Sequence, residues 1–276
     1  MATLIPAGDF RTTYRADTTI FPTLGSRVAL WVGLVLLCLA PLVFGRYEMG
    51  LLITIGFSAI AALGLNILVG FTGQISIGHA AFFGFGAFAS ALFHEWGVPV
   101  AVCIWLAGLA PAIIGLVFGA PAARLKGLYL AIATLAAQFI LEDFFARARW
   151  FSGGVAGRLT EPYNLFGYSF DNEQKYFYVV LAHVVIMFVA AANLMRTRDG
   201  RALIAVRDHY LSAEIMGINL AYYRTLSFGI ASFFAGVGGA LYAHYLQFVS
   251  VEAFNILFSI QFLAMVIIGG LGSIMG

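Results

Sequence analysis

Charged side chains are scarce in this sequence. Asp, Glu, Lys and Arg make up 10% of the 276 residues, whereas a soluble globular domain has about 25%. Hydrophobic residues make up 62%, and the mean hydropathy is +0.94. This composition excludes an ordinary soluble domain and indicates an integral membrane protein. The formal net charge of +2 is too small to indicate binding to nucleic acid.

Enzyme motifs are missing as well. The sequence has no GxxxxGK[ST] phosphate loop, no HExxH and no GxSxG. Its two cysteines, Cys38 and Cys103, each fall in an apolar run, which favours small packing residues over a disulfide. We therefore expect no enzymatic activity, no metal and no cofactor in this chain. The histidines also lack metal-ligand spacing; they are His79, His94, His183, His209 and His244.

The apolar runs are long enough for transmembrane helices of about 20 residues, and they lack the alternation of an outer-membrane barrel. We therefore predict an all-α, polytopic helical membrane protein with about eight transmembrane helices and one broken or glycine-rich segment near 70–86. Residues 1–27 would form an N-terminal tail and residues 28–276 the membrane domain, whose first span is retained. The candidate spans are 28–45, 50–69, 80–94, 99–120, 127–146, 176–195, 225–245 and 256–275.

Basic residues predict the orientation, because cytoplasmic loops are enriched in Lys and Arg. The tail, the short loop with Arg124 and Lys126, and the loop 196–224 fall on one side when spans are counted along the chain. We expect this side, with the N-terminus, to be cytoplasmic. The loop 147–175 would be external, where it could contact a partner or only connect two spans. The other basic residues of the cytoplasmic set are Arg11, Arg15, Arg27, Arg196, Arg198, Arg201, Arg207 and Arg224.

The stretch GFTGQISIGHAAFFGFG, residues 70–86, interrupts the apolar runs. Non-helical backbone exposed to hydrocarbon would leave polar groups unsatisfied, so this segment must be buried in protein or line a cavity. Two interpretations stay open. It could be a broken helix that serves a transport path, or a cytoplasmic turn followed by closely packed helix.

Isolated polar residues and small residues within the spans have structural and functional interpretations. For Asn66 and His183, interhelical hydrogen bonds are favoured over ligand contact. Glu142 and Asp143, one turn after Gln138, favour a solvated helix end over an external gate. Small residues at four-residue steps predict close helix packing within the chain, or a subunit interface; they are Gly115, Gly119, Ala231, Ala235, Gly239 and Ala243.

The loop 200–224 has a pattern typical of an amphipathic helix. Apolar residues are spaced among charges, and Gly217 is expected to end the helix. Such a helix could rest on lipid or dock a cytoplasmic partner, and the pattern does not separate the two. The apolar positions are Leu203, Ile204, Val206, Leu211, Ile215 and Met216.

Four stretches together resemble the LivM-type permease subunits of branched-chain amino acid ABC transporters. They are GLNILVGFTGQISIGHAAFFGFGAFASAL, RLKGLYLAIATLA, GRALIAVRDHYLSAEIMGI and AMVIIGGLGSIMG. The resemblance implies a multi-pass subunit of the bacterial inner membrane that carries branched-chain or related hydrophobic amino acids. It also implies a LivH-type permease partner, two cytoplasmic ATPase subunits that bind the ATP, and a periplasmic substrate-binding protein.

The resemblance assigns roles to particular residues. The loop 200–224 would be the coupling segment seated on the ATPase, although Tyr210 and Ser212 depart from the family's pattern. Its candidate residues are Arg207, Asp208, Ala213, Glu214 and Gly217. The candidates for lining or gating the substrate path are Thr72, Gly73, Gln74, Ser76, Gly78 and His79.

Other functions stay open at this point. Related permeases carry urea or short amides. A gradient-driven secondary transporter would need membrane-embedded carboxylates, which the sequence lacks away from the span ends, and a non-transporting scaffold is a third possibility. Family members continue beyond GGLGSIMG, so we expect this chain to lack the family's last helix or helices. The cluster GGLGSIMG also echoes GFTGQISIG as a weak internal repeat.

Overall fold

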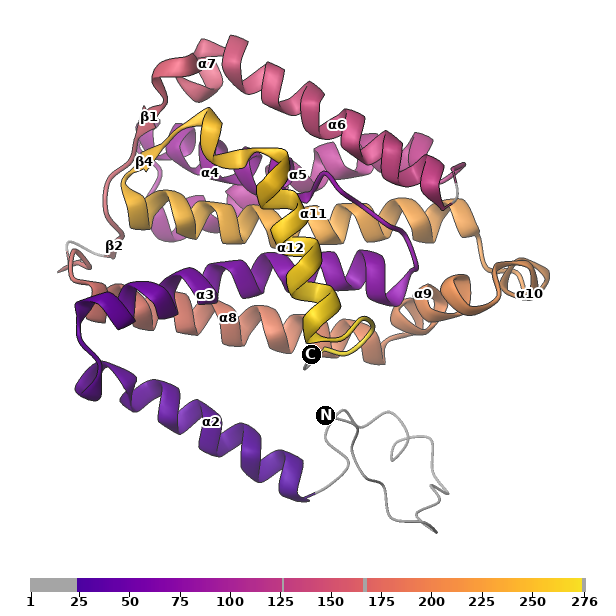
Figure 1. Ribbon diagram of the computed structural model, residues 1–276, viewed down its shortest axis with the longest axis horizontal. Helices are drawn as coiled ribbons and strands as arrows, with labels where there is room; N and C mark the ends of the chain where they lie inside the picture. Colours follow the sequence, from indigo (N-terminus) through magenta and orange to yellow (C-terminus); the bar gives the residue numbers. More distant parts are fainter. Residues whose placement is uncertain (1–23, 126, 166–167, 275–276) are drawn as a thin grey trace.

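The computed structural model describes residues 24–125, 127–165 and 168–274, and these residues form a helix bundle (Figure 1). Eight helices of 14 to 27 residues in the described residues coincide with the eight predicted apolar runs, so the predicted all-α membrane fold is confirmed. Their bounds are α2 Leu24–Val43, α3 Arg46–Asn66, α4 His79–Glu95, α5 Val100–Ala122, α6 Leu128–Arg147, α8 Glu173–Arg196, α11 Leu220–Leu246 and α12 Ile256–Gly269.

The eight helices differ in length. Among the described residues, five are long and apolar enough to cross a membrane: α3 with its extension to Phe71, α5, α6, α8 and α11. Helix α4 has 17 residues, about 25 Å at 1.5 Å per residue, which is short of a hydrocarbon core of about 30 Å. Helix α12 has 14 residues. The predicted eight spans are therefore five helices that are long and apolar enough to cross a membrane and three others, α4, α12 and α2, of which α2 is apolar over Val28–Val43.

Short elements connect the long helices. Strand β1 (Arg158–Leu159) pairs antiparallel with β4 (Phe248–Val249), which joins the loop 147–175 to the residues after α11, whereas β2 (Asn164–Leu165) pairs with β3 (Tyr168–Ser169) within that loop. The short helices are the π-helix η1 Ile67–Phe71, α7 Arg149–Ser152, the 3₁₀ helices η2 Gly154–Ala156 and η3 Val251–Phe254, α9 Arg198–Asp208 and α10 Tyr210–Ile215. The strands are β1 Arg158–Leu159, β2 Asn164–Leu165, β3 Tyr168–Ser169 and β4 Phe248–Val249.

Helix α11 is the centre of the bundle and packs against α3, α4 and α5. Gly115 of α5 lies so close to α11 that a Cβ atom there would be 2.7 Å from Ser232 Cβ. Gly239 of α11 lies directly against the backbone of Phe83. Lipid tails are as apolar as these side chains, so close packing rather than the hydrophobic effect holds the helices together. The predicted packing of small residues within the chain is confirmed.

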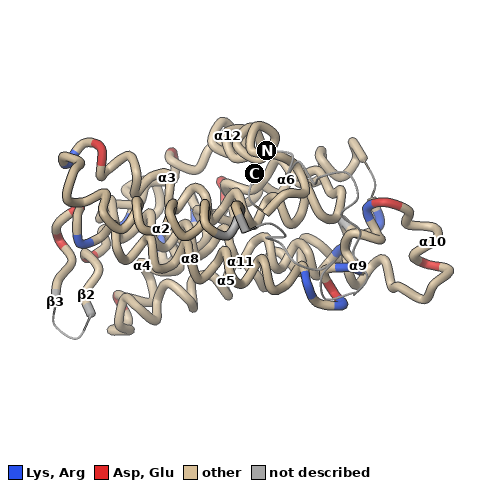
Figure 2. Tube along the Cα trace, turned by 90° about the horizontal axis from the view of Figure 1, so that it is seen from below, with Lys and Arg blue, Asp and Glu red and all other residues tan. Residues whose placement is uncertain are grey.

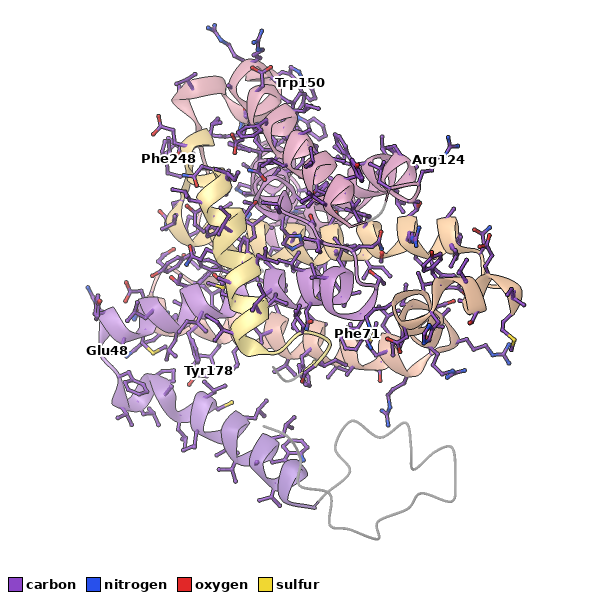
Figure 3. All side chains as sticks on the ribbon, turned by 45° about the vertical axis from the view of Figure 1, so that its right-hand side comes forward. Glu48, Phe71, Arg124, Trp150, Tyr178 and Phe248 are labelled. Carbon is purple, nitrogen blue, oxygen red and sulfur yellow. The ribbon has the colours of Figure 1, made fainter. Side chains whose placement is uncertain are left out.

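The two ends of the bundle carry separate groups of basic residues (Figure 2). At one end, which we call the α9–α10 end, Arg224 Nη1 donates a hydrogen bond of 3.0 Å to the carbonyl of Ala123. Figure 3 shows Arg124 toward this end and Phe248 at the other, where the loop 147–175 also lies. The predicted distribution of loops between the two ends is therefore confirmed. Arg11, Arg15 and Lys126 lie outside the described residues, as does the side chain of Arg27.

Helix α2 stands apart from the bundle (Figure 1), and a groove lies between it and the other helices. Two hydrogen bonds join it to α8: Tyr178 Oη donates to Cys38 O at 3.0 Å, and Gln174 Nε2 donates to Pro41 O at 3.2 Å. The groove has a volume of about 1400 Å³ and is lined mainly by apolar side chains of α2, α3, α8, α11 and α12.

Candidate functional site: the helix break and the α9–α10 segment

Helix α3 ends in a turn of π-helix, a feature often found at functional sites. The amide of Gly73 donates to Val69 O and that of Gln74 to Leu68 O, each at 3.1 Å. Gly73 has φ of +68°, which a residue with a Cβ atom adopts only with strain. The sequence therefore ends α3 sharply and turns the chain back into the bundle.

The non-helical link between α3 and α4, residues 72–78, runs back along α3 (Figure 1). His79 Nε2 lies 2.9 Å from the carbonyl of Ala61, which is ten residues before the end of η1. Helix α4 consequently begins inside the bundle. The structure thus agrees with a break in helix buried by protein rather than a turn at the surface. The break is shorter than the predicted segment, because residues 79–86 belong to the regular helix α4.

The first turn of α4 is capped by side chains from other helices. The amide of Ala80 donates to Ser259 Oγ at 2.8 Å, and that of Ala81 donates to Gln138 Oε1 at 2.9 Å. Ser259 Oγ also donates to Gln138 Oε1 at 3.0 Å, while Gln138 Nε2 donates to the carbonyl of Phe254 at 2.7 Å. The first amides of a helix have no partner within it, so these side chains replace the missing acceptors. No pattern in the sequence indicated a role for Ser259.

Glu142 and Asp143, near the end of α6, differ in burial and in their hydrogen-bond partners. Glu142 is half-buried and accepts a hydrogen bond of 2.7 Å from Gln138 Nε2. Asp143 is exposed and pairs with Arg147 at 2.8 Å, as expected of a solvated helix end. Only Glu142 is thus connected to the capping group of α4.

The predicted path residues lie in the link and at the start of α4. Thr72, Gln74, Ser76 and His79 are buried, and none of them contributes to the described groove. Gln74 Nε2 donates to Ser227 Oγ of α11 at 2.7 Å, which fastens the link to the central helix.

The link also contacts α6, and two of its polar atoms have no protein partner. The amide of Ile77 donates to Thr134 Oγ1 at 3.0 Å, and Gly78 packs against the backbone of Thr134. Within the described residues, Gln74 Oε1 and Ser76 Oγ are buried and make no hydrogen bond. Of the candidates, Thr72, Gln74, Ser76, Gly78 and His79 are thus buried between α3, α6 and α11, whereas Gly73 is exposed, and substrate contact stays a prediction.

The loop 200–224 forms two short helices instead of the single amphipathic helix predicted. The break is at His209, which has φ of −148° and ψ of 80°. Helix α9 buries Leu203 and Val206 against the bundle, whereas α10 leaves Ile215 85% exposed and Met216 83% exposed. One continuous helix could not present its apolar side both to the bundle and to the outside.

The candidate coupling residues lie at different depths. Ala213 is buried and Glu214 exposed, and Gly217, with φ of +87°, ends α10 as predicted. Arg207 and Asp208 form an ion pair of 2.8 Å, but Arg207 also turns inward, where Nη1 donates to the carbonyl of Gly70 at 2.7 Å. The sequence did not indicate this inward contact.

The isolated polar residues have structural partners. Asn66 Nδ2 donates to Ser273 O at 2.5 Å, and Asn66 Oδ1 accepts from the amide of Gly272 at 3.0 Å. His183 bonds to Val179 O in its own helix and stacks on Trp105 of α5. The predicted interhelical hydrogen bond of His183 is therefore wrong, and its contact with another helix is ring stacking. Within residues 24–125, 127–165 and 168–274, no group of three or more His, Cys, Asp or Glu side chains could hold a metal ion.

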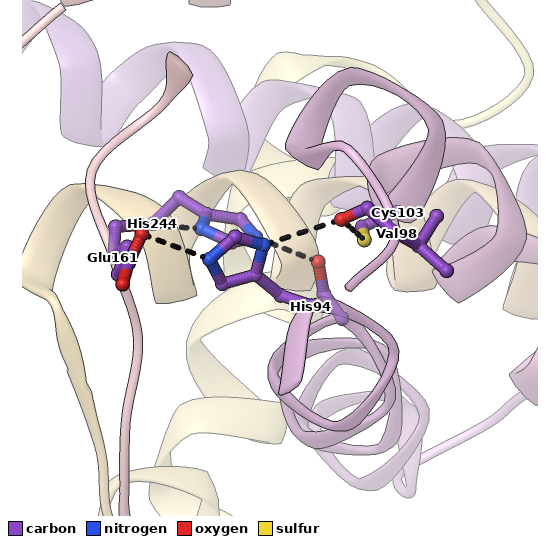
Figure 4. A network of polar contacts seen from close by, with 6 residues as sticks. His94, Val98, Cys103, Glu161 and His244 are labelled. Atoms are coloured by element: carbon purple, nitrogen blue, oxygen red, sulfur yellow. Dashed lines mark hydrogen bonds and ion pairs between the residues drawn. The ribbon is translucent and has the colours of Figure 1, made fainter. Parts of the chain in front are cut away.

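A polar network fastens the opposite end of the bundle (Figure 4). His94 Nε2 lies 3.2 Å from Glu161 Oε2, and His94 Nδ1 lies 3.2 Å from the carbonyl of Val98. His244 Nδ1 lies 2.8 Å from the carbonyl of Glu161, and Ser90 Oγ lies 2.8 Å from His244 Nε2. These contacts connect the loop 147–175 to α4 and α11.

Comparisons with known proteins extend these observations. The family model described as the permease component of the branched-chain amino acid transport system matches residues 48–276. Two proteins named "High-affinity branched-chain amino acid transport system permease protein LivM", from Salmonella typhimurium strain LT2 and Escherichia coli strain K12, are 32% and 31% identical over 239 residues. Each match covers 78% of this chain and 56% of the relative, so the chain spans about half the length of these relatives. No solved structure matches the chain.

Proposed function

The chain belongs to the family of branched-chain amino acid transport system permeases, and from this membership we propose that it is one transmembrane subunit of an ATP-driven importer. The substrates would be branched-chain or related hydrophobic amino acids. Family membership is the observation that carries the proposal, because two relatives are named for this transport. ATP would be hydrolysed on separate subunits, and this chain would have no catalytic residue or cofactor of its own.

The α9–α10 segment supports docking of a cytoplasmic ATPase subunit. Helix α9 anchors the segment to the bundle, while α10 projects from the end of the molecule (Figure 1). Ile215 and Met216 are exposed beside Glu214, and exposed apolar residues outside a membrane usually mark a contact surface. We propose that the α9–α10 end faces the cytoplasm of a bacterium and that this surface binds the ATPase.

The buried link supports a place in the substrate path. Transporters of several folds place broken helices next to their substrates, because helix ends and free backbone groups can bind polar atoms there. Gln74 Oε1 and Ser76 Oγ are buried without a partner within the described residues, and such atoms usually have one. In the proposed complex, a second permease subunit would complete the path, and a periplasmic protein would deliver the amino acid to the opposite end.

Reconstitution of the importer tests the function. The chain would be co-expressed with its partner permease, two ATPase subunits and the binding protein, and placed in vesicles that enclose ATP. We expect uptake of radiolabelled leucine that requires both ATP and the binding protein. Uptake of urea or acetamide in place of leucine would change the substrate class. Leucine uptake that persists without ATPase subunits and stops when ionophores collapse the ion gradients would contradict the proposal and favour a gradient-driven transporter.

Labelling tests the orientation separately. Met216→Cys places a thiol at the exposed end of α10, in a background in which Cys38 is replaced by Ala. A membrane-impermeant maleimide should label it in inverted vesicles and not in right-side-out vesicles. Trp96→Cys, at the opposite end, is the matched control and should show the reverse pattern. Labelling of Met216→Cys from the outside would contradict the proposed orientation.

A further inference from the structure

Three segments that are far apart in the sequence meet at the α9–α10 end. They are the π-turn η1 with the first residues of the link, the last turn of α9, and the loop 270–273 after α12. Two of these contain the glycine clusters whose similarity the sequence suggested. In space, the clusters are in contact with each other and with one arginine.

Arg207 makes the contact between α9 and η1. Its Nη1 donates to Gly70 O at 2.7 Å, and its stem passes Gly73, where an added Cβ atom would lie 3.1 Å from Arg207 Cγ. Gly70 O is near the end of a helix, where carbonyls have lost their partners within the helix. The amides of Gly73 and Gln74, which could have reached it, bond to Val69 and Leu68 instead. The guanidinium therefore satisfies a carbonyl that the π-turn leaves available.

The loop 270–273 encloses the same contact. Gly272 has φ of +74°, and a Cβ atom there would lie 2.9 Å from Arg207 Nη1 and 3.1 Å from Gly70 O. Asn66 holds this loop with two hydrogen bonds: its Oδ1 accepts from Gly272 N, and its Nδ2 donates to Ser273 O. Because residue 272 is glycine, the loop 270–273 can lie close to both the Gly70 carbonyl and the Arg207 guanidinium.

The position of Arg207 is also fixed from its own helix. Asp208 Oδ1 accepts from Arg207 Nε at 2.8 Å, so the guanidinium is oriented by a neighbouring charge while Nη1 reaches the π-turn. Hydrogen bonds with an ionised donor are about twice as strong as neutral ones. The contact is thus a directed connection from α9 to the residues that lead into α4.

We propose that Arg207 is the positioning residue that transmits movement of the ATPase-docking segment to the helix break between α3 and α4. This rests on the proposed function. Displacement of α10 by the ATPase would move α9, Arg207 would carry Gly70 and the π-turn with it, and the link 72–78 would shift relative to α6 and α11. In this role Arg207, whose side chain is 36% exposed, acts through its contact with Gly70, and the ATPase contact that the resemblance implied stays a prediction.

Substitution of Arg207 in the complete importer tests this role. Uptake of leucine and hydrolysis of ATP would be measured in the same vesicles. Arg207→Gln removes the charge, and we expect ATP hydrolysis to continue while leucine uptake per ATP falls about tenfold, the effect of losing one charge-assisted hydrogen bond. Arg207→Lys can still donate to Gly70 O and should retain an intermediate ratio. Arg201→Gln, on the same helix, is the control and should match the wild-type protein. A wild-type ratio in Arg207→Gln overturns the inference.

A reversible crosslink separates transmission from simple stability. An added Cβ atom on Gly73 would lie 3.8 Å from Arg207 Cβ, within the range of about 3.5–4.5 Å found in disulfides. In a Cys38→Ala background, the variant Gly73→Cys with Arg207→Cys should form a disulfide between the two introduced cysteines when a thiol oxidant is added. We expect the reduced form to show the low uptake per ATP and the oxidised form to recover toward the wild-type ratio, because the disulfide replaces the lost connection.

The outcomes distinguish this inference from the proposed function. If Gly73→Cys alone keeps the wild-type ratio, an oxidised double variant no better than the reduced one overturns the role of Arg207. The single variants Gly73→Cys and Arg207→Cys, treated with the same oxidant, show whether oxidation changes uptake per ATP without the disulfide. If the unmodified importer takes up leucine with ATP, the proposed function stands whichever way the Arg207 variants behave. If it does not, the proposed function itself fails.

Discussion

The two ends of the bundle are fastened in different ways. At the end with β1 and β4, strand pairing and the contacts of Glu161 with His94 and His244 hold the loop 147–175 against α4 and α11. At the α9–α10 end, α10 is exposed, and the hydrogen bond from Arg207 to Gly70 leads to the helix break. The first end holds a loop in place, whereas the second connects an exposed surface to the interior.

Charges introduced on α10 should have the largest effect, a loss of ATPase binding. If binding were unchanged, α10 would not be the exposed docking surface that distinguishes this end from the other. The double variant Ile215→Asp with Met216→Asp places two carboxylates on the exposed surface. Loss of a residue central to an interface costs about 2 kcal/mol, so we expect the two changes together to weaken binding of the ATPase subunit about 1,000-fold. Co-purification and titration of the ATPase measure this.

The control for that variant lies at the other end of the bundle. Trp96 is exposed and apolar but follows α4 at the β1–β4 end, so Trp96→Asp should leave ATPase binding unchanged. Equal binding by the α10 variant and the wild-type protein would instead indicate that α10 only rests on lipid.

Removal of the interior cap should have the next largest effect. Gln138→Leu leaves the Ala81 amide and the Phe254 carbonyl without their partner, and each buried group left unpaired costs about 1–3 kcal/mol. We expect a lower midpoint of thermal unfolding in detergent. Gln261→Leu, which changes an exposed glutamine of α12, is the matched control. Unfolding midpoints that agree between the two variants would show that α4 does not depend on this cap.

Removal of the Glu161–His94 ion pair at the β1–β4 end should have the smallest effect on stability. It tests whether that end only holds a loop in place. Glu161→Gln removes the charge that faces His94. The pair is partly exposed to solvent, so we expect a loss of about 1 kcal/mol or less. Hydrogen exchange in residues 158–165 should become faster while uptake per ATP is unchanged. Asp143→Asn, which disrupts another exposed pair at this end, should leave that exchange as it is. A lower leucine uptake per ATP in Glu161→Gln would mean that this end also transmits movement.

The sequence predicted the helices well and their polar connections poorly. Apolar runs bounded by charges located eight helices, because the membrane requires continuous apolar helix. Gly217 ended α10 as its backbone freedom suggested. The cap of α4 could not be predicted, since Gln138 and Ser259 are far from Ala80 in the sequence. The break at His209 was missed because the apolar positions on both sides of it fit one helical period.

The start of α4 has a consequence for how the protein is made. This helix leaves the ribosome before α6 and α12, yet the acceptors for its first amides belong to those later helices. Until they are inserted, the break in the membrane has unsatisfied backbone groups, which are costly in hydrocarbon. The acceptors for the first amides of α4 are therefore available only after α6 and α12 have been synthesised.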